Sequence, residues 1–124
     1  MAAIVIIDDD ADSCRTLARL LQFHGARPVS MPSSKLALAY LRKHVPRLII
    51  LNAMLPGTDG LEMLRHIRQD PRTAEVPVIM LSAISDPRFI RHAKAKGATD
   101  YWVKSEIDYA ELKKLLTPYI ARTD

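Results

Sequence analysis

The sequence is poor in cysteine and has no long apolar run, and each absence excludes a class of protein. A single cysteine, Cys14, cannot form an internal disulfide, which excludes a disulfide-stapled scaffold and agrees with a reducing compartment. No apolar segment approaches the roughly 20 residues needed to span a bilayer. The apolar start at residues 2–7 has no basic flank before it and no small-residue cleavage signal after it. We therefore expect a cytoplasmic protein without a membrane segment.

Clusters of basic residues are also lacking. The chain has 18 Lys and Arg against 14 Asp and Glu, a net charge of +4, yet no four basic residues are consecutive. Because this charge is spread over the whole length, it is typical of solvated helix faces, and a protein partner is favoured over nucleic acid. The 124 residues, of which 48% are hydrophobic, suit one domain spanning residues 1–124.

A buried strand followed by polar residues organises the centre of the chain. Residues 48–51 are all apolar, which is typical of a strand covered on both faces. Asn52, a Pro-Gly turn and a helix start at Asp59 come next. Similar patterns elsewhere give a total of five predicted strands, over residues 3–7, 27–31, 48–51, 76–81 and 99–103.

Five helix patterns alternate with these strands. We expect the second helix to place Leu36, Ala39, Tyr40 and Lys43 along one face and the last to hold Leu112, Leu115, Leu116, Tyr119 and Ile120 on one stripe. Crossovers of this length predict an α/β fold with a doubly wound parallel sheet and helices on both faces. Capping residues mark where these helices begin, and glycines or prolines mark where they end. The predicted helices run from Asp12 or Ser13 to Gly25, from Ser33 or Ser34 to about His44, from Asp59 to Pro71, from Asp86 to Gly97, and over about 107–121.

Four strand ends place polar side chains at one edge of this sheet, where ligands collect in open parallel sheets. Residues 8–10 are aspartates after the first strand, and Asn52, Ser82 and Lys104 follow the third, fourth and fifth. Each alone has an ordinary structural role, in a helix start, a turn or a solvated side chain. Together, carboxylates suited to Mg²⁺ lie beside a hydroxyl and a lysine suited to phosphoryl oxygens, which is the set that phosphoryl transfer requires.

These residues resemble the receiver domain of bacterial response regulators over essentially the whole chain. The segment Asn52-Ala-Met-Leu-Pro-Gly-Thr-Asp-Gly60 is similar to the family pattern Asp-x-Met-x-Pro-Gly-x-Asp-Gly except at its first position. The resemblance implies a flavodoxin-like three-layer sandwich with five strands and five helices, and a role in two-component phosphorelay signalling. The other matching segments are the acidic pair in Ile-Ile-Asp8-Asp9-Asp10, the Ser/Thr strand in Met80-Leu81-Ser82-Ala83 and the lysine strand over residues 97–104, with Tyr101 at the aromatic switch position.

In a standard member the resemblance implies phosphorylation of an acceptor aspartate by a phospho-histidine kinase, with Mg²⁺ held by the acids. Carried over to this chain, it makes Asp9 a direct metal ligand, Asp8 its water-mediated partner and the Met54 backbone carbonyl a third contact. The implied phosphoryl contacts are Ser82 and Lys104, and the implied switch residue, which turns inward to reshape the output face, is Tyr101.

Two residues depart from the family pattern. Asn52 stands at the acceptor position, where a neutral amide cannot act as the carboxylate nucleophile. Its oxygen can contact a metal, but the site loses a negative charge, so we expect Mg²⁺ to bind more weakly and Lys104 to turn toward Asp8 or Asp9. Ser105 replaces the proline that usually follows the lysine. Because a cis bond before a non-proline residue costs about 3 kcal/mol, we expect a trans Lys104–Ser105 bond.

The leading hypothesis is a pseudo-receiver, not an enzyme, that signals without phosphorylation. Its partner is a histidine kinase or a downstream signalling protein, bound through the fourth helix, fifth strand and fifth helix. A weak homodimer through the same face is a further expectation. The candidate contacts Arg88, Arg91 and Lys94 also fit a solvated basic stripe. Three alternatives stay open: an ordinary receiver with an engineered Asp-to-Asn change at position 52, phosphoryl transfer to Asp8, Asp9 or Ser82, and a flavodoxin-like cofactor carrier.

Overall fold

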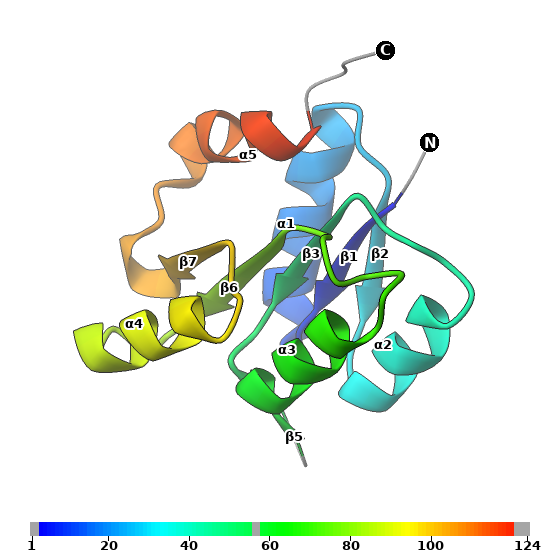
Figure 1. Ribbon diagram of the computed structural model, residues 1–124. Helices are drawn as coiled ribbons and strands as arrows, with labels where there is room; N and C mark the ends of the chain where they lie inside the picture. The colour runs from blue at the N-terminus through cyan, green and yellow to red at the C-terminus, as the bar shows by residue number, and fades with distance from the viewer. Residues whose placement is uncertain (1–2, 56–57, 121–124) are drawn as a thin grey trace.

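Five parallel strands form the central sheet (Figure 1), as predicted. The computed structural model describes residues 3–55 and 58–120. Every neighbouring pair in the sheet is parallel. The Pro-Gly turn at 56–57 and the predicted helix end at 121 lie outside the described residues. The strands are β1 (Ile4–Ile7), β2 (Pro28–Met31), β3 (Leu48–Leu51), β6 (Val78–Ser82) and β7 (Asp100–Val103), in the spatial order β2-β1-β3-β6-β7.

Five helices cover the two faces of this sheet, which confirms the doubly wound arrangement. Helices α2, α3 and α4 pack on one face, and α1 and α5 pack on the other. None of the helices within the described residues is long and apolar enough to cross a membrane. The helices are α1 (Ala11–Phe23), α2 (Ser34–Leu41), α3 (Gly60–Gln69), α4 (Pro87–Ala95) and α5 (Leu112–Ile120).

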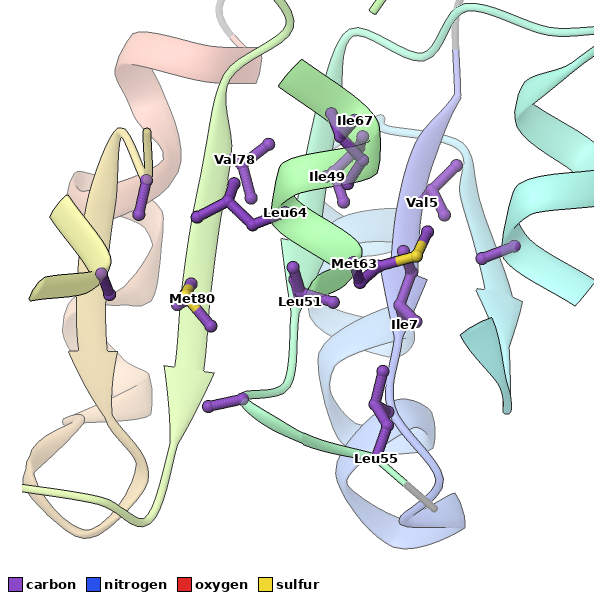
Figure 2. Close-up of a cluster of buried hydrophobic side chains, with 14 of the residues drawn as sticks. Val5, Ile7, Ile49, Leu51, Leu55, Met63, Leu64, Ile67, Val78 and Met80 are labelled. Atoms are coloured by element: carbon purple, nitrogen blue, oxygen red, sulfur yellow. The ribbon is translucent and has the colours of Figure 1, made fainter. Parts of the chain in front are cut away.

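The core lies on both sides of the three central strands. All residues of β1, β3 and β6 are buried, as expected for parallel strands covered on both faces. Figure 2 shows Leu64 of α3 extending toward Val78 of β6 and Met63 extending toward β1, which carries Val5 and Ile7. Each fully buried aliphatic side chain contributes about 1.5–3 kcal/mol, so this packing fixes the strand ends that carry the polar residues.

The first helix begins earlier than predicted. Asp10, not Asp12 or Ser13, is the N-cap, because its Oδ1 accepts hydrogen bonds from the backbone N–H groups of Asp12 at 3.0 Å and Ser13 at 3.3 Å. The hydrogen bonds from Ser13 hold the pKa of the Asp10 carboxyl below its usual value. The other predicted caps are confirmed, with Ser33, Asp59 and Asp86 each accepting from a backbone N–H of the helix that follows.

The second helix differs from the prediction in length and in its buried face. It ends at Leu41 instead of His44, and Leu36 is 51% exposed. The buried positions are Ser34, Ala37 and Leu41, spaced by three and four residues. Leu36 and Ala39 of the predicted face are exposed instead, so that face was wrong.

The segment after β7 also differs from the single helix predicted over 107–121. Two 3₁₀ turns, Lys104–Glu106 and Tyr109–Glu111, precede α5. The Asp108 carboxylate accepts from the Ala110 N–H, which caps the second turn and delays the start of the α-helix. Within α5, Leu112 and Leu116 are buried whereas Leu115 is 38% exposed, so the expected apolar stripe is narrower than predicted.

A short antiparallel hairpin follows β3 and was not predicted. Its strands are β4 (Met54–Leu55) and β5 (Thr58–Asp59). The hairpin returns the chain to β3, where the Gly60 N–H donates to the Ala53 carbonyl at 2.9 Å. A Cβ on Gly60 would lie 2.6 Å from the Ala53 Cα, so the start of α3 needs glycine to approach the strand end so closely.

A Gly60→Ala variant is therefore expected to be less stable by about 1–3 kcal/mol, the usual cost of forcing an extra carbon into a packed site. The added methyl group meets backbone atoms, which cannot move aside without shifting residues 52–53. Urea unfolding of the variant beside the native chain measures this. A change below about 0.5 kcal/mol, the range of a neutral surface substitution, would show that the loop relaxes freely.

Arg68 joins the end of α3 to two distant loops. Its guanidinium donates to the carbonyls of Gly97 at 3.0 Å, Ala74 at 3.1 Å and Val76 at 2.6 Å, and to Thr99 Oγ1 at 3.4 Å. Its side-chain carbons pack against Gly97, which has a φ of +118° and where an added Cβ would lie 3.0 Å from the Arg68 Cγ. This clamp fixes the start of β6 and the turn into β7.

An Arg68→Met variant is expected to lose about 2–4 kcal/mol of unfolding free energy, because it leaves several loop carbonyls without donors while keeping a similar apolar stem. Arg65 provides a matched control, since it lies on the same helix, is exposed and pairs with Glu62. Chemical unfolding of both methionine variants should separate them clearly. Equal losses of unfolding free energy at the two positions would contradict a special role of Arg68 in joining the loops.

Candidate functional site

Three of the predicted site residues meet at the carboxyl ends of the strands. Asp8 follows β1, Asn52 follows β3 and Lys104 follows β7. Asn52 Nδ2 donates to Asp8 Oδ1 at 3.0 Å, and Lys104 Nζ lies 2.9 Å from Asp8 Oδ2. The expectation that Lys104 turns toward an aspartate is confirmed, and the partner is Asp8.

Asp8 is the buried centre of this group. Its side chain is 4% exposed, and Oδ1 also accepts from the Asp10 N–H at 3.0 Å. Both carboxylate oxygens therefore have donors from the protein itself. Lys104, 22% exposed, supplies the compensating charge. A buried carboxylate is costly unless it is paired and hydrogen-bonded in this way.

The Asn52 amide is oriented by two hydrogen bonds, one that it donates and one that it accepts. Its nitrogen donates to Asp8, and its oxygen accepts from the Met54 N–H at 3.3 Å. This assignment places the amide nitrogen, not the oxygen, against the carboxylate. An aspartate in the same place would put an anionic oxygen there. Position 52 therefore contributes a donor to the site.

Ser82 and Tyr101 both form hydrogen bonds with the backbone of Ile84. Ser82 Oγ accepts from the Ile84 N–H at 3.1 Å, and the Tyr101 hydroxyl donates to the Ile84 carbonyl at 2.9 Å. Tyr101 is 8% exposed, and its ring meets Phe89 edge-on with centroids 6.1 Å apart. Burial raises the pKa of the Tyr101 phenol. The aromatic residue thus points inward and fixes the loop before α4.

Cys14 and Ile84 are contacts of the site that sequence reasoning missed. Cys14 Sγ donates to the Asp8 carbonyl at 3.3 Å from the buried face of α1. Burial raises the pKa of this thiol. Ile84 takes part only through its backbone, so no residue type signals its role. The spacing of Cys14 from Leu17 and Leu21 was the available signal for its burial.

Comparison with known proteins places this site in a family. The family model for the response regulator receiver domain matches residues 4–117. The chain belongs to the response regulator receiver family. It is 40% identical over 105 residues to the transcriptional regulatory protein AfsQ1 of Streptomyces coelicolor, covering 84% of this chain and 45% of that protein. It is 31% identical over 116 residues to an uncharacterized 14.6 kDa protein of Leptolyngbya boryana, covering 94% and 88%.

Solved structures support the receiver fold. The chemotaxis protein CheY4 of Vibrio cholerae is 26% identical, with a TM-score of 0.87 over 97% of this chain and 99% of that one. This receiver therefore has the flavodoxin-like architecture and belongs to two-component signalling. It spans about half the length of AfsQ1.

Receiver domains bind Mg²⁺ at the acceptor site, but the donor set of this receiver fits a divalent cation poorly. Asp8 already accepts three hydrogen bonds, including one from the Lys104 ammonium. Asn52 turns its donor inward, whereas Asp9 is exposed. Within residues 3–55 and 58–120, no three His, Cys, Asp or Glu side chains gather as a metal-binding set.

The predicted partner residues lie together on the exposed side of α4. Arg88, Arg91 and Lys94 are all exposed, and Arg88 and Lys94 lie 3.5 and 3.9 Å from Asp86 and Asp100. Such exposed pairs are weak, so the stripe keeps its positive charge.

The Lys104–Ser105 peptide bond, directly after β7, is trans, as expected, since the described residues contain no cis peptide bond.

Proposed function

We propose that this receiver signals through protein contact without phosphorylation at position 52. The carrying observation is the bond from Asn52 Nδ2 to Asp8 Oδ1. Phosphoryl transfer to this position needs an ionised carboxylate as nucleophile, and an amide lacks both the charge and the chemistry. Asn52 instead completes the hydrogen bonding of a buried aspartate, which makes it a structural member of the site.

The other proposed roles follow from the same network. Asp8, Asp9, Asn52 and the Met54 carbonyl are the groups that would hold a metal, but we expect weakened Mg²⁺ binding. Lys104 already provides a cation 2.9 Å from Asp8, and the amide adds no negative charge. The ammonium thus takes over the charge compensation that a metal gives to a standard receiver.

Transfer to another residue is disfavoured by the contacts. Asp8 is buried and accepts three hydrogen bonds, so its oxygens are engaged. Ser82 is 1% exposed, and its hydroxyl accepts from the Ile84 N–H; among the residues that the structure describes, no carboxylate or imidazole contacts it to act as a base. The inward Tyr101 holds the loop before α4 in one position without a phosphoryl group. This supports a surface at α4 that is available to a partner at all times.

The partner surface proposed here is the face of α4, β7 and α5. Its contacts Arg88, Arg91 and Lys94 suit an acidic patch on a histidine kinase or a downstream signalling protein, or a second copy in a weak homodimer. The test is capture of partners on the immobilised full chain, with and without a small phosphodonor. We expect equal capture in both conditions and loss with R88E/R91E/K94E.

The matched control for this capture carries reversed charges on the distant α2 and its flank, K35E/R42E/K43E. This variant has the same change in net charge, so it should keep the partner if the contact is specific. Capture that rises strongly with the phosphodonor would contradict the proposed function. Loss with the control variant as well would assign the effect to net charge alone.

A further inference from the structure

A basic surface lies at the amino-terminal ends of the strands, opposite the candidate site. Arg27 precedes β2 and Arg47 precedes β3, on either side of the start of β1. Backbone hydrogen bonds of 2.9 Å join both residues to that start, from the Ile4 N–H to the Arg27 carbonyl and from the Arg47 N–H to the Ala3 carbonyl. The loops from α2 to β3 and from α3 to β6 reach the same end of the sheet (Figure 1).

Five Lys or Arg residues gather on these loops. The Arg72 guanidinium donates to the Arg42 carbonyl, which ties the loop after α3 to the end of α2. Lys43 follows Arg42 directly, and Arg27, Arg42, Lys43 and Arg72 are all exposed. In the described part of the chain, no carboxylate lies at ion-pair distance from Arg27, Arg42 or Lys43. We call this group the basic end of the sheet, and its members are Arg27, Arg42, Lys43, Arg47 and Arg72.

The fold separates charges that are mixed along the sequence. At the carboxyl ends of the strands, the residues after β1 and the caps of α3 and α4 are acidic. At the opposite end, segments 24–27, 42–47 and 70–77 contain two acids, and one of these, Asp70, is paired with Arg72 at 2.9 Å. The spread of charge along the sequence favoured a protein partner over nucleic acid. The folded chain instead presents a local concentration of positive charge, which is the electrostatic signature of a nucleic-acid surface.

Two exposed rings accompany these cations. Phe23, at the end of α1 and four residues before Arg27, is 83% exposed, more than any other large hydrophobic side chain in the described residues. His44 follows Lys43, is exposed, and stacks on the Tyr40 ring with centroids 4.3 Å apart and planes at 24°. Proteins that hold single-stranded nucleic acids combine such rings, on which unpaired bases stack, with cations that contact the phosphates.

We propose that the basic end of the sheet binds single-stranded nucleic acid. Its guanidinium and ammonium groups contact phosphates, and Phe23 and His44 stack on unpaired bases. An acidic protein segment would use the same cations but would leave the two rings without a matching planar group, so the rings favour a nucleic acid. The surface shares no residue with the partner face proposed at α4, so this inference stands independently of the proposed function.

The first test measures fluorescence anisotropy of the full chain with two labelled probes. One is an oligothymidylate of about 20 nucleotides, and the other is an abasic strand of the same length, which has the same phosphates but no bases. We expect the native chain to bind oligothymidylate about fivefold or more tightly than the abasic strand, and F23S/H44S to bind the two equally. An oligouridylate of the same length shows whether RNA or DNA is preferred, and tighter binding of either one than of the abasic strand supports the proposal.

The second test compares two variants with the same change in net charge. R27E/R42E/K43E should bind oligothymidylate about tenfold or more weakly than the native chain, whereas R88E/R91E/K94E on α4 should change the affinity much less. Arg27, Arg42 and Lys43 form backbone hydrogen bonds that survive these substitutions, so circular dichroism should show the first variant folded. For five phosphate contacts, the logarithm of the native affinity should fall with the logarithm of the salt concentration with a slope of about −3, and R27E/R42E/K43E should reduce this slope.

Four results would overturn the proposal. The first is no binding of oligothymidylate or oligouridylate by the native chain at low salt. The second is equal binding of these probes and the abasic strand, which would leave the rings without a role. The third is equal weakening by the two charge variants, which would assign the binding to net charge alone. The fourth is tighter binding of a polyglutamate peptide than of oligothymidylate, which would make the occupant an acidic protein.

Discussion

A Lys104→Met variant is expected to lose about 2–4 kcal/mol of unfolding free energy, toward the lower end of the usual cost of breaking a buried ion pair. Asp8 is 4% exposed and would lose the only cation that lies within 4 Å of it among the described residues. The 22% exposure of Lys104 reduces the cost through solvent screening. The measurement is urea unfolding at neutral pH, where the carboxylate is ionised in the unfolded chain.

A double-mutant cycle isolates the pair from its neighbours. Asp8→Asn alone leaves Lys104 free to reach water, whereas the Asp8→Asn/Lys104→Met pair removes both charges. We expect the double variant to be more stable than Lys104→Met alone, with a coupling above about 1 kcal/mol, as found for residues in one network. Additive losses would mean that Lys104 acts only through packing and would contradict its role as the internal cation.

An Asn52→Asp variant is expected to make stability depend on Mg²⁺. The new carboxylate replaces a donor that lies 3.0 Å from Asp8 Oδ1. Two like charges about 4 Å apart interact by about 4 kcal/mol near a protein surface, and Lys104 offsets part of this. We therefore expect a loss of about 1–3 kcal/mol in the absence of divalent cations.

Mg²⁺ should reverse that loss, because it binds the folded variant and not the unfolded chain. At a concentration 100-fold above its Kd, a ligand stabilises by about 2.7 kcal/mol. The matched control is Asn52→Ala, which removes the same amide without adding charge and should show no Mg²⁺ effect. An equal Mg²⁺-induced shift in the native chain would contradict the poor fit of its donor set.

The sheet and the positions of its polar ends were predictable because their signals are local. A parallel strand covered on both faces is a run of apolar residues, and Leu48–Leu51 has the bounds expected for β3. The same rule placed Asn52 and Lys104 at one edge. What it could not decide was which aspartate Lys104 meets, since Asp8 and Asp9 are adjacent and only the geometry buries the first.

The errors arose where neighbouring residues suit one role equally well. Asp10, Asp12 and Ser13 are all good helix caps, and in the structure Asp10 caps α1. In α2, Ala37 and Leu41 are buried whereas Leu36 is exposed, although all three are apolar residues that suit the buried face of a helix. The clamp on Ile84 uses backbone groups, which carry no residue-specific signal.

The most direct test of the central claim is the intact mass of the native chain and of Asn52→Asp after incubation with acetyl phosphate and Mg²⁺. We expect an unchanged native mass and the gain of one phosphoryl group in the variant, because position 52 alone disables the nucleophile. A stable gain in the native chain would contradict the claim by revealing another acceptor. No gain in the variant would contradict it by showing that the site is disabled elsewhere.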